Sequence, residues 1–198
     1  MKLYLSTVGI AMLTVSGLNI LFGTAPWYHI ICAVIYCVIL NFMLDAAIAI
    51  LIKIMPNRWF MPENPSYHVF SFERKIYGWL NVRRWKDKVL QLGGIGGFSK
   101  RRIKEPNNPK YIERFIIECN KGVLTHRLCY FVGFFVMLII SDKFVFSVAL
   151  PSAVVNLYLN VLPTIVLRYN TPMLKSVLAR LRRISNTKKE DDMLIQHR

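Results

Sequence analysis

The chain has 198 residues and a formal net charge of +15, and 54% of its residues are hydrophobic. Its mean hydropathy of +0.36 and its charged content of 19% exclude an intrinsically disordered chain. Four cysteines in 198 residues are too few for a disulfide scaffold. A composition that is both apolar and strongly basic leaves two classes, nucleic-acid binders with large cores and membrane proteins with one basic side.

Four apolar segments predict membrane-spanning helices, because about 20 apolar residues of helix cross a hydrocarbon core of about 30 Å. In chain order they cover residues 3–22, 30–52, 124–140 and 144–167. The second segment carries one charge, Asp45, and the third begins with His126 and Arg127. Short connections within the first pair and within the last pair predict two antiparallel hairpins. The sequence therefore predicts an all-α, multi-pass membrane protein that forms a single domain over residues 1–198.

The basic residues gather in two segments. Residues 53–127 hold 16 Lys and Arg against 6 Asp and Glu, and residues 168–198 hold 8 against 3. The positive-inside rule then places both termini, the loop 53–123 and the basic tail 168–198 on the cytoplasmic side of the cell membrane. No soluble domain remains outside the four spans, so we expect the lipid bilayer rather than nucleic acid as partner.

Residues 70–90 combine aromatic and basic side chains at helical spacing. Trp79, Val82, Trp85 and Val89 recur every three or four residues, and most Arg and Lys side chains fall on other faces. The pattern predicts an amphipathic helix at the cytoplasmic interface. Such a helix either anchors among the lipid headgroups or packs on the ends of the spans.

A glycine-rich stretch, Gly93–Lys100, follows this helix. It lacks the spacing of a nucleotide-binding loop, so we interpret it as a flexible connection or a loop that a lipid substrate approaches closely. Lys100 and Arg101 stand at its end. They are candidates to bind phosphates of a headgroup or coenzyme, and contact with the anionic leaflet is the alternative.

The next helical pattern begins at Pro109 and runs into the third span, which places Glu118 and His126 near the cytoplasmic edge of the bilayer. His126 is the best candidate for a general base, because an unperturbed histidine titrates near pH 6.5. An interfacial histidine bonded to a carbonyl is the alternative. Glu118 lies about 12 Å away along the helix, so a carboxylate that orients His126 must come from elsewhere. We expect Glu73 in that role.

Polar residues in the other spans are further candidates. Burying Asp45 costs about 2.5–3.5 kcal/mol, so we expect it to pair with Arg127, Asn156 or Asn160 in a structural clasp between helices. Asn160 and Arg168 are eight residues apart and can line one cavity mouth. There Arg168 either binds a carboxylate or phosphate, or extends to the membrane edge. No C-x-x-C or H-x-x-x-H spacing occurs, so no metal site is predicted.

Several motifs follow one another over about residues 70–185. They are Phe70-x-Phe72-Glu73, Val82–Lys88, Gly96–Lys100, Glu113–Glu118, His126, Asn160 and Arg168–Leu174. In this order and spacing they resemble the glycosyl-4,4'-diaponeurosporenoate acyltransferase family, which acylates a glycosylated C30 carotenoid acid. The family motif E-T-x-R-A-E-L-x-H-W falls on residues 118–127. Here Val123 replaces its second Glu, and Arg127 replaces its Trp.

The resemblance implies an acyltransferase that moves a fatty acyl group from a CoA or acyl-carrier thioester to a hydroxyl of a glycosylated lipid, without a bound cofactor. In this hypothesis His126 is the base, Glu118 or Glu73 orients it or the acceptor, and Asn160 stabilises the oxyanion. The expected substrate-binding residues are Trp85, Lys86, Lys100, Arg101, Arg168 and Asn170. The alternatives are a non-catalytic lipid-binding membrane subunit and a different small membrane enzyme, such as a methyltransferase with a nucleotide-like pocket.

Overall fold

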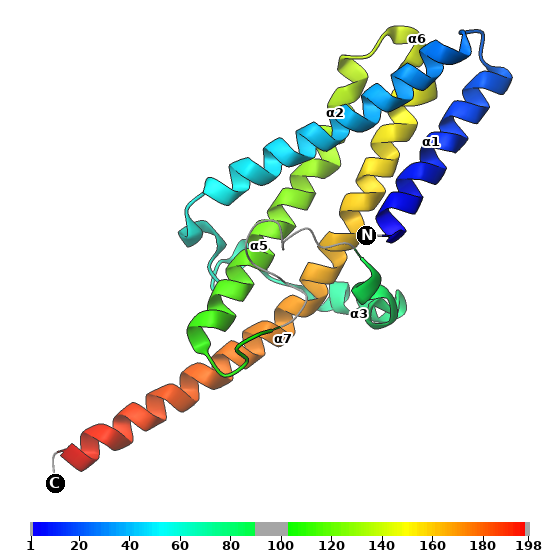
Figure 1. Cartoon of the computed structure of the whole chain (residues 1–198). Coiled ribbons are helices and arrows are strands. Elements are labelled where there is room, and N and C mark those ends of the chain that lie inside the picture. Colours follow the sequence, from blue (N-terminus) through cyan, green and yellow to red (C-terminus); the bar gives the residue numbers. More distant parts are fainter. Residues whose placement is uncertain (1, 90–102, 197–198) are drawn as a thin grey trace.

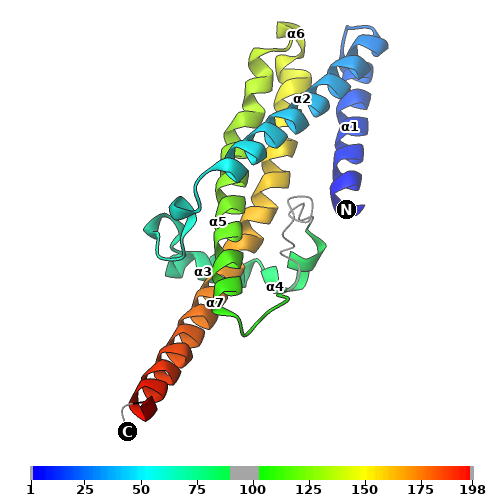
Figure 2. The same ribbon diagram turned by 60° about the vertical axis from the view of Figure 1, so that its left-hand side comes forward.

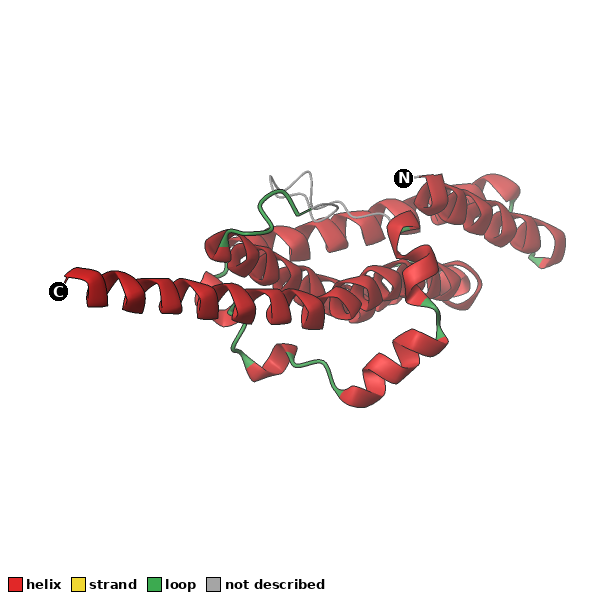
Figure 3. Ribbon diagram, turned by 90° about the horizontal axis from the view of Figure 1, so that it is seen from below, coloured by secondary structure: helices red, strands yellow, loops and turns green. Residues whose placement is uncertain are grey.

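A computed structural model describes residues 2–89 and 103–196, and the described residues form helices and loops without a strand (Figure 3). The longer helices are α1 (Lys2–Phe22), α2 (Trp27–Ile54), α3 (Ser71–Trp79), α5 (Pro109–Val132) and α7 (Leu150–Gln196). The short elements are η1 (Asn57–Phe60), η2 (Pro65–Tyr67), α4 (Val82–Trp85), η3 (Lys86–Lys88), η5 (Gly133–Leu138), α6 (Asp142–Phe144) and η6 (Val145–Ala149). The all-α prediction is confirmed.

Four helical segments are long and apolar enough to cross a membrane, as the sequence predicts. They are Tyr4–Phe22, Trp27–Ile54, Pro109–Leu138 and Asp142–Thr187. The turn between α1 and α2 and the turn between α5 and α7 lie at the same end of the bundle, and the elements from η1 to η3 lie toward the other end (Figure 1). The predicted pair of antiparallel hairpins is therefore confirmed.

The α5 and α7 helices form the centre of the bundle. The α2 helix crosses this pair obliquely, and α1 lies at the edge (Figure 2). The larger apolar cluster joins α5 and α7 to the η1 and η2 connection and includes the buried Phe60, Ile116 and Leu174. A second cluster, with Val34 and Val136, joins α2 to η5 and η6. Large apolar side chains stay exposed along α1 and α2, as expected of helices that face lipid.

The last helix differs from the prediction. The predicted fourth span ends at residue 167 and is followed by a basic tail, but α7 continues as one helix through Pro163 and Pro172 and far into that tail. Each proline removes one backbone donor from the helix. The hydroxyls of Thr164 and Thr171 donate to the carbonyls of Asn160 and Leu167, at 3.1 Å and 2.9 Å. Each of these carbonyls is adjacent to one that loses its N–H donor to a proline.

The predicted amphipathic helix over residues 70–90 is also corrected, because it is divided into α3, α4 and η3. Asn81 separates the first two in a left-handed conformation with φ 50°. Asparagine adopts this conformation more readily than other residues with a Cβ. Val82 and Trp85 pack toward Tyr169 on α7, whereas Trp79 is 85% exposed. The segment thus packs on a spanning helix and still presents an aromatic side chain outward.

Candidate active site

A connected set of polar side chains lies inside the apolar bundle. The Asp45 carboxylate on α2 accepts hydrogen bonds from the side-chain amides of Asn156 and Asn160 on α7, at 3.2 Å and 2.9 Å. The Asn160 Oδ1 lies 2.7 Å from Nδ1 of His126 on α5. The predicted clasp around Asp45 is confirmed with the two asparagines. The salt bridges among the described residues do not include one between Asp45 and Arg127.

This set of bonds fixes which nitrogen of His126 carries its proton. The Asn160 Nδ2 donates to Asp45 and to the carbonyl of Asn156, so its Oδ1 faces the imidazole as an acceptor. Nδ1 of His126 must therefore donate, and Nε2 of the neutral ring carries the lone pair. A ring in this tautomer has the polarity that a general base requires.

Two sequence expectations are corrected at this point. His126 contacts Asn160, which in turn contacts Asp45. Glu73, expected to orient His126, instead forms an ion pair with Arg168. The amide nitrogen of Asn160 is already engaged by Asp45 and the carbonyl of Asn156. The geometry thus places Asn160 against the His126 ring, and its amide nitrogen does not face an open space where an oxyanion would form.

Glu73 and Arg168 form a buried ion pair between α3 and α7. The guanidinium Nε and Nη2 contact the two carboxylate oxygens of Glu73 at 2.7 Å and 2.6 Å. The same Nη2 donates to the carbonyl of His68 at 2.8 Å, and the hydroxyl of Tyr77 donates to Glu73 at 2.7 Å. Arg168 is only 5% exposed and Glu73 14%. The pair fastens α3 to the spanning helix with two parallel hydrogen bonds.

The ionised form of the Glu73 carboxylate is strongly stabilised. Burial alone would raise the pKa of Glu73, but hydrogen bonds from Arg168, Tyr77 and the Phe70 N–H outweigh it and lower the pKa to about 2. Burial and the neighbouring Glu73 carboxylate raise the pKa of Tyr77 to about 12. Glu73 is thus an ionised structural anchor at neutral pH and not a proton acceptor.

A cationic pocket of about 570 Å³ lies beside this ion pair, between the α3–η3 segment and α7. Its walls include the basic side chains of Arg74, Arg83, Lys86 and Arg168, with Asp87 as the acid. Phosphate groups suit such a site, because arginine and lysine bind them through charge-assisted hydrogen bonds. Arg74 and Arg83 were not predicted, although Arg83 stands in the same basic motif as Lys86.

The pocket brings together several of the residues expected to bind substrate. Lys86, Arg168 and Asn170 line it, and Lys86 Nζ donates to Asn170 Oδ1 at 3.4 Å. Trp85 packs near the pocket and donates its indole N–H to the carbonyl of Leu80 at 3.0 Å. The other two residues of that set, Lys100 and Arg101, lie outside the described residues.

Comparison with known proteins decides the family of this chain. The glycosyl-4,4'-diaponeurosporenoate acyltransferase family matches residues 56–180, which is well over half of the chain. The chain belongs to this family. The matched region contains the Glu73–Arg168 pair, the cationic pocket, His126 and Asn160. No curated protein and no solved structure matches the chain.

Membership of the glycosyl-4,4'-diaponeurosporenoate acyltransferase family supports acyl transfer to a glycosyl carotenoid as the general activity.

Two positions of the family motif lie on α5. Glu118 is half-buried, two helical turns before His126, and the described structure shows no hydrogen bond between them. Val123, at the second Glu of the family motif, is 1% exposed and belongs to the larger apolar cluster. Its position suits an apolar side chain, because an isolated carboxylate would be costly there.

A metal site in the described part of the chain would need a cluster of side chains that could coordinate the ion. Within residues 2–89 and 103–196, no group of three or more His, Cys, Asp and Glu side chains is placed to hold one. The polar set beside His126 contains two amides and one carboxylate, and one of the amides, that of Asn160, contacts the imidazole.

Replacing Gly133 by alanine should disturb the polar set, because the start of η5 approaches α2 and α7 closely at this residue. A Cβ atom here would lie 2.8 Å from Nδ2 of Asn156 and 3.1 Å from Oδ1 of Asn41. We expect a loss of about 1–3 kcal/mol, typical of overpacking, measured by thermal unfolding in detergent. The matched control is Gly17→Ala, where the new Cβ meets nothing within 4 Å. Equal melting temperatures for the two variants would contradict the close approach.

Proposed function

We propose that this protein transfers a fatty acyl group from a thioester donor to a sugar hydroxyl of a glycosylated C30 carotenoid acid or a similar glycolipid. The observation that carries the proposal is the hydrogen-bonded line from Asp45 through Asn160 to His126, in a chain of this acyltransferase family. A half-buried carboxylate, an amide that connects it to the imidazole, and a histidine with Nε2 as acceptor form an arrangement suited to proton abstraction.

In the proposed reaction, Nε2 of His126 takes the proton of the sugar hydroxyl as its oxygen attacks the thioester carbonyl carbon. The tetrahedral intermediate collapses, the C–S bond breaks, and the imidazolium returns the proton to the departing thiolate. The products are the acyl ester and the free thiol. The negative charge of Asp45, acting through Asn160, favours the imidazolium that forms between these steps. Glu118, which is half-buried on the same helix as His126, is proposed to contact the acceptor sugar.

The cationic pocket is proposed to hold the phosphates of the donor, either coenzyme A or an acyl-carrier arm. Arg168 lies eight residues after Asn160 on α7, which is about 12 Å along the helix. A flexible pantetheine arm bridges such a separation between its phosphate and its thioester. The acceptor carries no charge on its sugar, so the basic walls favour the donor rather than the acceptor.

Removing two cations from this pocket should weaken donor binding selectively. We expect the double variant Arg83→Ser with Lys86→Met to raise the KM for acyl-CoA by about a hundredfold or more, with kcat nearly unchanged. Charge-assisted hydrogen bonds contribute about 1.5–3 kcal/mol each, and 1.4 kcal/mol corresponds to tenfold. Steady-state kinetics in proteoliposomes measure both constants. The control is Arg58→Ser, which removes an exposed cation outside the pocket. An unchanged KM in the double variant would remove the phosphate-binding role.

We also propose that the protein lies in the cell membrane, with the bilayer as its partner and both termini in the cytoplasm. The four apolar helices support a membrane location. The cationic pocket lies against the part of α7 beyond Asn160, away from the two hairpin turns, which supports a cytoplasmic assignment for that end by the positive-inside rule.

The direct test of the proposed function is acyl transfer in isolated membranes that contain the full chain. Labelled acyl-CoA and a glycosylated C30 carotenoid acid are supplied, and the product ester is separated by chromatography. We expect ester formation that depends on the protein and on both substrates. Membranes that contain folded protein but form no more ester than empty membranes would overturn the proposal.

A further inference from the structure

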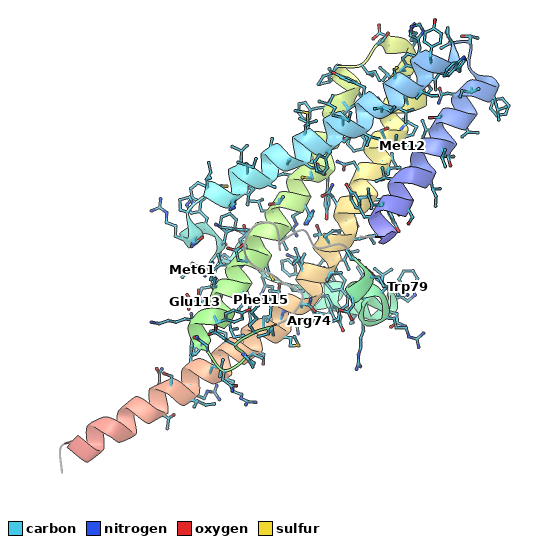
Figure 4. The ribbon with its side chains drawn as sticks, in the orientation of Figure 1. Met12, Met61, Arg74, Trp79, Glu113 and Phe115 are labelled. Atoms are coloured by element: carbon cyan, nitrogen blue, oxygen red, sulfur yellow. The ribbon has the colours of Figure 1, made fainter. Side chains whose placement is uncertain are left out.

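A second pocket lies between α1, α2 and α7, and its lining is mostly apolar, whereas that of the cationic pocket is basic. This apolar groove has a volume of about 350 Å³. Its walls are mostly aliphatic and aromatic and include Val8, Met12, Val38, Phe42, Val155 and Leu159. Its side chains come from all three helices, and Figure 4 labels Met12 on α1. The shape and lining suit an apolar chain rather than a sugar.

One wall of the apolar groove connects to the candidate active site. Asn41 and Asn156 line the groove, and Asn156 is also a donor to Asp45. Asn160, which holds His126, stands one helical turn beyond Asn156. Oδ1 of Asn41 is buried and has no hydrogen-bond partner in the part of the chain that the structure describes. The groove therefore joins an apolar interior to the polar groups around the proposed base.

The size of the apolar groove indicates which apolar chain it binds, the acyl chain of the donor or the C30 polyene of the acceptor. Its lining on α1 extends from Tyr4 to Val15, about 16 Å of helix and so about half of a hydrocarbon core of about 30 Å. A methylene group fills about the volume of one water molecule, roughly 30 Å³, so the groove holds about a dozen carbons. A single acyl chain fits within this length and volume. A C30 polyene needs more than twice the volume.

Resting on the proposed function, we infer that the apolar groove binds the acyl chain of the thioester donor and sets the chain length that is transferred. Along α7, groove residues near Asn156 come first, Asn160 with His126 next, and the cationic pocket at Arg168 last. This order matches the parts of an acyl-CoA: the hydrocarbon chain, the reacting carbonyl and the phosphates. In this inference the length of the groove sets the chain length that is accepted, and Met12 is one of the side chains that line it.

Changing the size of Met12 tests the groove through chain-length preference. We expect Met12→Trp to shift transfer toward shorter acyl-CoA and Met12→Ala toward longer acyl-CoA. Each shift should be at least about fourfold in the ratio of dodecanoyl to hexadecanoyl transfer, the effect of one buried methylene. The matched controls are Leu13→Trp and Leu13→Ala, because Leu13 is 77% exposed and outside the groove. Equal chain-length ratios in the wild type and in both Met12 variants would overturn the inference.

A binding measurement separates this inference from the proposed reaction. The probe is hexadecanoyl-CoA with a terminal diazirine, photolysed with the full chain in nanodiscs and mapped by mass spectrometry. We expect adducts on groove residues in the wild type and in the inactive His126→Ala variant, and fewer adducts in Met12→Trp but not in Leu13→Trp. Adducts spread over outward-facing residues, unaffected by Met12→Trp, would show bulk lipid contact and overturn the groove. Groove adducts without transfer activity would leave acyl-chain binding intact and overturn only the reaction.

Discussion

Replacing His126 by alanine should lower the rate of acyl transfer by about two to four orders of magnitude, the usual contribution of a general acid–base group. The loss follows because the hydroxyl would have no other positioned acceptor for its proton, and the thiolate no positioned donor. The measurement is single-turnover transfer of labelled acyl groups in membranes that contain equal amounts of folded protein. Wild-type turnover by His126→Ala would exclude His126 as the base.

The variant Asp45→Asn tests the relay behind His126. The new amide can donate to Oδ1 of Asn160, so the Asn160 amide is free to reverse and to present its NH₂ to Nδ1 of His126. The neutral ring would then carry its proton on Nε2, the wrong nitrogen for a base. We expect a loss of turnover that approaches that of His126→Ala, with little change in donor KM. The control, Asp142→Asn, changes an exposed acid on α6 in the same way and should retain activity.

Breaking the ion pair of Glu73 and Arg168 should have the largest effect on stability. Arg168→Met leaves the half-buried Glu73 carboxylate without its guanidinium partner, which costs up to about 3–5 kcal/mol, the loss typical of a fully buried pair. Thermal unfolding in detergent measures the change. The control is Arg182→Met, which breaks ion pairs with Glu63 and Glu113 on the surface. Exposed pairs contribute up to about 1 kcal/mol, so a similar melting temperature for both variants would contradict the buried anchor.

The same ion pair predicts a dependence of stability on pH. The pKa of Glu73 falls from 4.5 to about 2 on folding, so its contribution is fully present above about pH 4.5. It is lost as the pH decreases toward 2 and the carboxylate is protonated. The wild type should therefore lose more stability than Glu73→Gln between these two pH values. Parallel loss in both proteins would show that Glu73 does not contribute in this way.

The helices could be predicted from the sequence because their signal is local. A run of apolar residues is enough to predict a spanning helix. A carboxylate within such a run, Asp45, requires polar partners, so its contacts could also be expected. The ion pair between Glu73 and Arg168 could not be predicted, because 95 residues separate its members and periodicity does not indicate which helices meet. The continuity of α7 through Pro172 was missed, because proline usually ends a helix in water.

The hydrogen-bond partner of His126 could not be predicted from the sequence for a different reason. The sequence indicated that a carboxylate which orients His126 must come from another element, and Glu73 was the expected residue. The structure instead places an amide, Asn160, between His126 and Asp45. Each of these residues was a candidate by itself, but their order along the hydrogen bonds depends on how α2, α5 and α7 cross.

The length of α7 has a consequence for how the protein can be handled. A helix of 47 residues is about 70 Å long, whereas a bilayer with its headgroups is about 40–45 Å thick. If α7 crosses the bilayer, a large part of it must stand in water, beyond the lipid surface (Figure 1). A fluorescent domain or an affinity tag attached to the C-terminus would be held at a distance from the headgroups, so labelled protein should remain suitable for purification and imaging.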